Sequence, residues 1–320
     1  MRVSVVICTR NRAASLDRTL GSLAAMGAPA GTPWELVIVD NGGTDATPEV
    51  VAGHVGALPV RRVFEPEPGL SNARNRGVAE ARGDYIVWTD DDVIVQPGWL
   101  SAYLHAFETF PEAAVFGGKV TPSLEAPTPD WFSQNRDLLA FLIAERDFGA
   151  EPVTLDAAEH RLPFGANFAI RGAEQRAHRY DPDLGVGPGR NRSGEETAVI
   201  RAILAEGARG VWIPDAEVLH LIPAARQTEA YVVDYYRGIG ATWAHLHGRA
   251  GENFMGPNLA QDRPRVLGAP ALAWRKQWEH RLKYLALRPT APPRRWLWHL
   301  TQYGFYRGAV EQWRLQAGLA

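Results

Sequence analysis

Short apolar segments alternate with helical patterns over the first 120 residues, and this alternation restricts the fold more than any other feature. The apolar segments are VSVVIC (3–8), ELVIVD (35–40), VRRVFE (60–65), DYIVWT (84–89) and AAVFGGKV (113–120). Unbroken apolar runs of this length are typical of strands that are buried on both faces of a sheet. Strand–helix alternation at this spacing predicts an α/β fold in which helices flank a mostly parallel central sheet.

The middle of the chain is less regular. Prolines, among them Pro122, Pro127, Pro129 and Pro152, interrupt residues 121–163, where we expect loops and one helix near 134–147. The apolar segment FGANFAI (164–170) is predicted to form a strand. Two further short strands are predicted at GVWI and AEVLHLI.

Helices are predicted in the remaining segments. SGEETAVIRAILAEG (193–207) has the pattern of a helix that Ser193 caps and Gly207 ends. From Thr228 onwards the chain is helical, with breaks around 251–270 and at RPTAPP (288–293). The C-terminal part is therefore expected to be a helical extension of the α/β fold.

Polar residues follow three of the predicted strands at the point where each strand ends. Because ligands bind beyond the C-terminal ends of the strands in such sheets, these residues predict a binding edge. They are Thr9, Arg10, Asn11 and Arg12 after the first strand, Asp40 and Asn41 after the second, and Asp90, Asp91 and Asp92 after the fourth.

The three consecutive aspartates have two interpretations. Adjacent carboxylates repel one another and resist desolvation, so a solvated turn would explain them. A divalent cation would instead turn their repulsion into ligation. A phosphatase-type D-x-D-x-[TV] pattern fails at Ile94, and neither a P-loop nor a dinucleotide-binding glycine pattern is present.

Four other residues are candidates for chemistry, and each also has a structural explanation. Arg74, in GLSNARNRG (69–77), is either a surface arginine or a ligand of a diphosphate at a helix N-terminus. Glu195 and Glu196 begin a helix, where carboxylates are favoured in any case, or one of them is a general base. His220 is either structural or a metal ligand.

Composition and charge exclude several classes of protein. The net charge of −2 over 320 residues argues against a dedicated nucleic-acid binder. The single cysteine, Cys8, fits a reducing compartment, so we expect a cytoplasmic protein. Neither a signal peptide nor an apolar stretch of about 20 residues is visible.

Basic residues and tryptophans are interleaved over residues 263–320. This composition suits the headgroup layer of an anionic membrane, and would place the protein on the cytoplasmic face of the inner membrane. The alternative is that the aromatic side chains pack on the catalytic domain or form a homodimer interface.

Seven motifs, in order, closely resemble those of family 2 glycosyltransferases with the GT-A fold. They are VVICTRNR, LVIVDNGGTDAT, GLSNARNRG, VWTDDDV, FGANFAIRG, SGEETAV and LHLIPAAR. The resemblance covers residues 1–245, with a Rossmann-like nucleotide-sugar half (1–120) and an acceptor half (121–245), and leaves 246–320 as the extension. It implies inverting transfer of a sugar from a nucleoside diphosphate to a hydroxyl, with Mg²⁺ or Mn²⁺.

The same resemblance implies a role for each candidate residue. Thr9, Arg10, Arg12, Asp40, Asn41, Arg74, Asp90 and Asp91 would bind the nucleotide, Asp92 and His220 the metal, and Gly165, Ala166 and Asn167 the donor sugar or acceptor. Glu196 matches the catalytic base. That position is a glutamate here and an aspartate in the family, so either Glu195 or Glu196 could be the base.

The donor and the acceptor are defined only as classes. The donor would be a UDP-, GDP- or dTDP-sugar, and the acceptor a glycan or a lipid-linked glycan. A metal-dependent phosphohydrolase or nucleotidyltransferase remains a rival interpretation, as does an inactive scaffold that binds sugar nucleotides.

Overall fold

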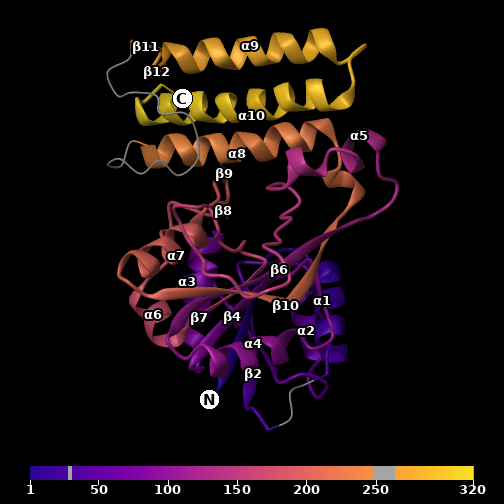
Figure 1. Ribbon diagram of the computed structural model, residues 1–320, viewed down its shortest axis with the longest axis vertical. Coiled ribbons are helices and arrows are strands. Elements are labelled where there is room, and N and C mark those ends of the chain that lie inside the picture. Colours follow the sequence, from indigo (N-terminus) through magenta and orange to yellow (C-terminus); the bar gives the residue numbers. More distant parts are fainter. Residues whose placement is uncertain (28–30, 248–263, 320) are drawn as a thin grey trace. The chain divides into compact units, whose positions relative to one another are not determined.

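The computed structural model describes residues 1–27, 31–247 and 264–319, which form two compact units (Figure 1). The first unit comprises Met1–Ser123, Ala144–Gly185 and Gly194–Leu221. The second comprises Leu124–Ile143, Val186–Ser193 and Ile222–Ala320.

The first unit is an α/β structure around one large sheet. Its strands are β1 (Val3–Thr9), β2 (Trp34–Asp40), β3 (Val60–Phe64), β4 (Tyr85–Asp90), β5 (Val93–Val95), β6 (Ala113–Leu124), β7 (Asn167–Arg171) and β10 (Arg209–Ile222). Its helices are α1 (Ala13–Ala25), α2 (Thr47–Gly53), α3 (Leu70–Glu80), α4 (Trp99–Thr109), α6 (Gly172–Ala177) and α7 (Glu195–Ala205).

The eight strands lie in the order β3-β2-β1-β4-β7-β6-β10-β5. The four strands β3, β2, β1 and β4 are parallel, as the sequence predicts. The pairs β4–β7, β6–β7 and β10–β5 are antiparallel. The sheet is thus mixed and mostly parallel, and the expected fold class is confirmed.

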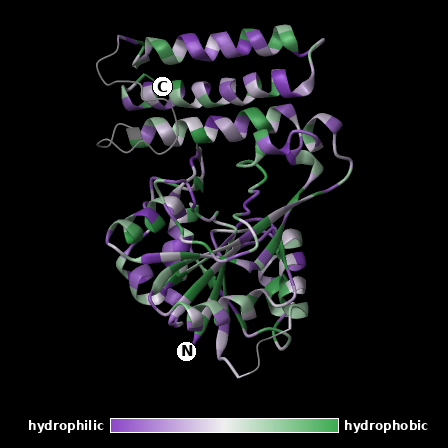
Figure 2. Ribbon diagram, viewed as in Figure 1, coloured by the Kyte–Doolittle hydropathy of each residue, from purple (hydrophilic) through white to green (hydrophobic). Residues whose placement is uncertain are grey.

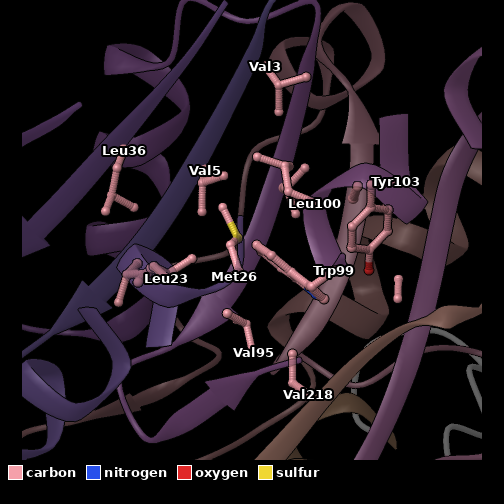
Figure 3. Close-up of a cluster of buried hydrophobic side chains, with 14 of the residues drawn as sticks. Val3, Val5, Leu23, Met26, Leu36, Val95, Trp99, Leu100, Tyr103 and Val218 are labelled. Atoms are coloured by element: carbon pink, nitrogen blue, oxygen red, sulfur yellow. The ribbon is translucent and has the colours of Figure 1, made fainter. Parts of the chain in front are cut away.

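Helices cover both faces of this sheet, and its central strands are strongly apolar (Figure 2). On one face, side chains of β1 and β2 pack against α1 and α4, where Met26, Trp99 and Tyr103 are buried (Figure 3). On the other face, α3 and α7 pack against Trp88 and Phe168. Burial on both faces explains why these strands are continuous apolar runs in the sequence.

Three local predictions are wrong. No helix spans 134–147: the chain forms α5 (Asp130–Ser133) and a 3₁₀ turn, η1 (Arg136–Leu139), because Ala144 has a φ of +52° and Arg146 pairs with the backbone of β6. The two short strands at 209–222 are one strand, β10. Gly194, with a φ of +92°, is the N-cap of α7 in place of Ser193.

The second unit is built on three long helices. They are α8 (Glu229–His247), α9 (Ala271–Leu287) and α10 (Pro293–Gln316), and α10 lies between the other two (Figure 1). Two hairpins, β8–β9 (Val186–Gly187 and Arg190–Asn191) and β11–β12 (Arg265–Val266 and Ala269–Pro270), belong to the same unit. Helices in this part of the chain agree with the sequence-based expectation.

Glycines allow α8 and α10 to approach closely. A Cβ atom added at Gly308 would lie 1.8 Å from the carbonyl oxygen of Arg237, and one added at Gly240 would lie 1.8 Å from that of Phe305. Neither backbone oxygen could move without displacing a helix. In the described part of the chain, none of the helices is long and apolar enough to cross a membrane.

Candidate active site

The C-terminal ends of the parallel strands bring the predicted polar residues to one edge of the first unit. In the register of the sheet, Thr9 pairs with Asp40, and Cys8 with Asp90. The aspartate triplet therefore lies beside the residues that follow β1. This is the edge where ligands bind in open α/β sheets.

Asp91 and Asp92 are not in a solvated turn. Both are buried, and Arg12 bridges them, with Nη1 at 2.6 Å from Asp91 Oδ1 and Nη2 at 2.7 Å from Asp92 Oδ2. The hydroxyl of Thr9 donates a hydrogen bond of 2.7 Å to Asp91. Burial raises the pKa of Asp91 to about 7, although the charge of Arg12 opposes the shift.

Asp92, the predicted metal ligand, lies beside a histidine. His220, on β10, has its Nε2 at 3.5 Å from Asp92 Oδ2, and both side chains are buried. Asp90 and Asp91 add two further carboxylates next to this pair. Within the described residues no group of three or more such side chains is arranged as a complete metal site. One carboxylate and one imidazole would therefore be a partial ligand set, which a diphosphate could complete.

Arg74 connects the strand-end acids to the acids of α7. It is 3% exposed, and its Nη1 lies 3.3 Å from Glu195 Oε1 and 3.8 Å from Glu196 Oε2. Its Nη2 is 4.0 Å from Asp90 Oδ1. Yet Nη1 makes no hydrogen bond within the described chain. A buried guanidinium with an unsatisfied N–H group is suited to receive an anionic ligand.

The two glutamates of α7 have different environments. Glu195 is 3% exposed, and burial, with the neighbouring charge of Glu196, raises its pKa to about 7 against the opposing effect of Arg74. Glu196 has 12% of its side chain exposed, and its Oε1 accepts a hydrogen bond of 3.2 Å from the backbone N–H of Gly165. Glu196 is thus the more accessible carboxylate.

The segment 165–167 has one residue beside the acids and two in the core. A Cβ atom at Gly165 would lie 2.6 Å from Arg74 Nη2, so a larger residue there would require the guanidinium of Arg74 to shift. Ala166 is buried, and its carbonyl oxygen accepts a hydrogen bond from the hydroxyl of Thr89. The side chain of Asn167 is buried and joins strands and helix α4 through four hydrogen bonds, with Trp99, Tyr103, Lys119 and Ala216.

The side chains of Asp40 and Asn41 both form hydrogen bonds with neighbouring protein groups. The carboxylate of Asp40 is fully buried, accepts hydrogen bonds from Nε and Nη2 of Arg62 at 3.0 and 2.7 Å, and caps the N–H of Gly43. Asn41 ties the loop after β3 to β2 through the backbone of Glu65, Glu67 and Gly69. Arg10 is exposed at the same edge.

Sequence reasoning missed Arg62 and Phe64. Arg62 packs over the ring of Phe64, which is 46% exposed at the end of β3 and pairs in register with Asp40. The sequence does hold a signal for both residues. VRRVFE is a predicted strand, so its last residues should lie at the same edge as Asp40.

Known families and proteins resemble this chain over much of its length. Residues 4–160 match glycosyl transferase family 2. A glucosyl-dolichyl phosphate glucuronosyltransferase of Haloferax volcanii is 28% identical over 228 residues, 69% of each chain. The succinoglycan biosynthesis protein ExoM of Rhizobium meliloti is 26% identical over 253 residues, 78% of this chain and 75% of that protein.

Solved structures resemble this fold as well. The mannosyltransferase PcManGT from Pyrobaculum calidifontis, in complex with GDP-Man and Mn²⁺, superposes with a TM-score of 0.63 at 18% identity, over 97% of this chain and 86% of that one. S. aureus TarS 1-349 in complex with UDP-GlcNAc gives a TM-score of 0.56 at 16% identity, over 99% and 92%. At these identities the likeness establishes the GT-A type fold.

Proposed function

Since the chain is a family 2 glycosyltransferase, we propose that it catalyses the inverting transfer of a sugar from a nucleoside diphosphate to an acceptor hydroxyl, with a divalent cation. The observation that carries this proposal is the position of Arg74. It lies between Asp90, at the strand-end edge, and Glu195 and Glu196 on α7. Transfer needs positive charge beside a leaving diphosphate and a carboxylate beside the attacking hydroxyl, and this cluster provides both.

On the donor side, Asp92 and His220 would hold Mn²⁺ or Mg²⁺. When bound, the cation would stabilise the negative charge of the leaving nucleoside diphosphate. Arg74 would contribute a second positive charge from the protein. Arg12 would keep Asp92 in place through the ion pair described above.

On the acceptor side, Glu196 would be the general base. Its carboxylate would take the proton of the acceptor hydroxyl as that oxygen bonds to the anomeric carbon and the bond to the diphosphate oxygen breaks. Attack opposite the leaving group inverts the anomeric configuration. The N–H of Gly165 would hold Glu196 in position, and Glu195 would hold Arg74.

The nucleotide would lie along the ends of β1, β2 and β4, near Thr9, Arg10, Arg12, Asn41, Asp90 and Asp91. Arg62 and the backbone N–H of Gly43 donate hydrogen bonds to the buried carboxylate of Asp40. We therefore expect Asp40 to position Arg62, and Arg62 to contact the base of the nucleotide. Structural neighbours are in complex with GDP-Man, UDP-GlcNAc and UDP, which supports a nucleoside diphosphate sugar as the donor class.

We propose a glycan or lipid-linked glycan as the acceptor, because named relatives act on glucosyl-dolichyl phosphate or take part in succinoglycan biosynthesis. A cytoplasmic enzyme at the inner face of a membrane would meet such acceptors. In this proposal, residues 1–245 carry the chemistry and 246–320 form an extension. Residues 248–263 of that extension, including Arg263, lie outside the described residues.

A panel of nucleotide sugars with Mn²⁺ tests the proposal. We expect free nucleoside diphosphate to be released from one UDP-, GDP- or dTDP-sugar, and the rate to rise when an acceptor glycan is added. A rate of release that does not change when the acceptor is added would instead indicate a phosphohydrolase. Binding of a nucleotide sugar without release under any condition would indicate an inactive scaffold.

A further inference from the structure

The C-terminal helices carry an excess of positive charge. Residues 264–319 contain ten arginines and lysines but only two acidic residues, Glu279 and Glu311, in a chain whose net charge is −2. A sign asymmetry of this size indicates a binding surface for an anionic partner. The helices α9 and α10 hold most of these basic residues.

The side of α9 that faces away from α10 is apolar at its centre. Trp278, Leu282 and Leu285 follow one another at helical spacing and are 48%, 62% and 55% exposed. Along α9, apolar and polar residues alternate (Figure 2), and the opposite side of the helix buries Ala273, Gln277 and His280. We call Trp278, Leu282 and Leu285, with Arg275 and Arg281, the outer face of α9.

The two arginines of this face have no acidic partners in the part of the chain that the structure describes. Glu279, the only acid on α9, forms ion pairs with Lys276 at 3.1 Å and Lys283 at 2.8 Å. Arg275 and Arg281 are exposed and make no ion pair within the described chain. Arg281 instead lies over the rings of Trp278 and Tyr303. Two exposed guanidinium groups, neither of them in an ion pair within the described chain, therefore border three exposed apolar side chains.

We propose that the outer face of α9 binds the surface of an anionic lipid bilayer, with the helix lying in the headgroup layer. Tryptophan and leucine would enter the boundary of the acyl chains, while the arginines contact lipid phosphates. The face cannot span the bilayer, since no helix of the described chain meets that requirement. Membrane binding of this kind adds a docking surface to the proposed transferase and does not depend on its chemistry.

A second copy of the chain fits this face less well. A two-fold interface places the same surface on both partners, so the basic side chains of one outer face would lie near those of the other. Like charges at an interface are unfavourable. Three apolar side chains on one helix also fall well short of the roughly 800 Å² that each partner buries in a stable complex. Charge complementarity therefore favours the bilayer.

Co-sedimentation of the full chain with vesicles tests the proposal. We expect the protein to pellet with vesicles that contain phosphatidylglycerol and to stay in the supernatant with pure phosphatidylcholine. The double variant R275Q/R281Q should bind about 30-fold more weakly, since each basic side chain near the surface contributes about fivefold. The variant L282S/L285S should bind more weakly at every salt concentration.

Matched substitutions on the first unit control for general effects of charge and surface. Arg2 and Arg82 are exposed arginines, and Val55 is 65% exposed. The variants R2Q/R82Q and V55S should pellet as the wild type does. Equal binding of R275Q/R281Q and the wild type to anionic vesicles would overturn the proposal. So would a wild-type dimer that L282S/L285S converts to a monomer, without vesicle binding by either. Neither readout depends on sugar transfer, so an inactive enzyme would not affect the result.

Discussion

The strand-end site and the C-terminal helices use charge in opposite ways. In the site, Arg12 and Arg74 are each surrounded by carboxylates, and three of the five acids that they contact, Asp91, Asp92 and Glu195, are buried. On α9, Arg275 and Arg281 are exposed and have no acidic partner among the described residues. Buried and mutually paired charges indicate chemistry on a small ligand, whereas exposed and unpaired ones indicate an extended partner.

The largest expected effect is at Asp92, where the comparison predicts a functional loss without a loss of fold. Asp92→Ala would remove the proposed metal ligand, so the charge of the leaving diphosphate would lose its counter-charge and Mn²⁺-dependent transfer should fall to background. Nucleoside diphosphate release measures the effect, and circular dichroism checks the fold. A folded Asp92→Ala variant that keeps the wild-type rate would exclude the proposed metal role.

The next effect separates the two glutamates of α7. Glu196→Gln keeps the shape of the side chain but cannot accept a proton, so kcat should fall about 100- to 10,000-fold with little change in donor KM. Glu195→Gln should have a smaller effect on kcat, because Glu195 contacts Arg74 from a buried position. Steady-state kinetics of both variants measure the difference. A larger loss of kcat in Glu195→Gln would reverse the assignment.

In the helices, the comparison predicts effects on stability and none on donor chemistry. Gly308→Leu would force a side chain against the backbone of Arg237 on α8, and we expect a loss of about 3 kcal/mol in the free energy of unfolding. Urea unfolding measures it. The control is Gly21→Ala in α1, where nothing lies within 4 Å of the added atom and stability should be unchanged or slightly raised. Equal stability of Gly308→Leu and the wild type would contradict the close packing.

Patterns of burial explain which parts of the fold and of the site could be predicted from the sequence. The strands of the first unit are evident because each is a continuous apolar run, and the strand ends then place Thr9, Asp40 and the aspartates together. The bond between Arg62 and Asp40 is not evident, because it joins neighbouring strands through side chains 22 residues apart. The helix expected at 134–147 fails for the same reason, since Arg146 pairs with the distant backbone of Val120. Contacts between distant segments are what a single sequence conceals.

The smallest predicted effect concerns stability. The free energy of unfolding should depend on pH with opposite signs in the two regions. His280, on α9, lies with its Nδ1 at 3.0 Å from that of His299, and burial, with the charge of His299, lowers its pKa to about 4 from 6.5. An unfolded histidine takes up a proton below pH 6.5, whereas folded His280 stays neutral down to about pH 4. The unfolded state therefore binds more protons in this window, and the helices should lose stability as pH falls through it.

Glu195 should make the stability of the first unit fall as pH rises, opposite to the effect of His280 on the helices. Its pKa is about 7 in the folded protein and 4.5 in the unfolded chain, so the folded state binds more protons between these values. Its contribution to stability is present below pH 4.5 and is lost as pH rises to 7. Hydrogen exchange of the two units at several pH values would resolve the opposite slopes. His280→Gln should flatten only the slope of the helices, and Glu195→Gln only that of the first unit. If one of these variants altered both slopes equally, the two groups would not titrate as independent parts of the molecule.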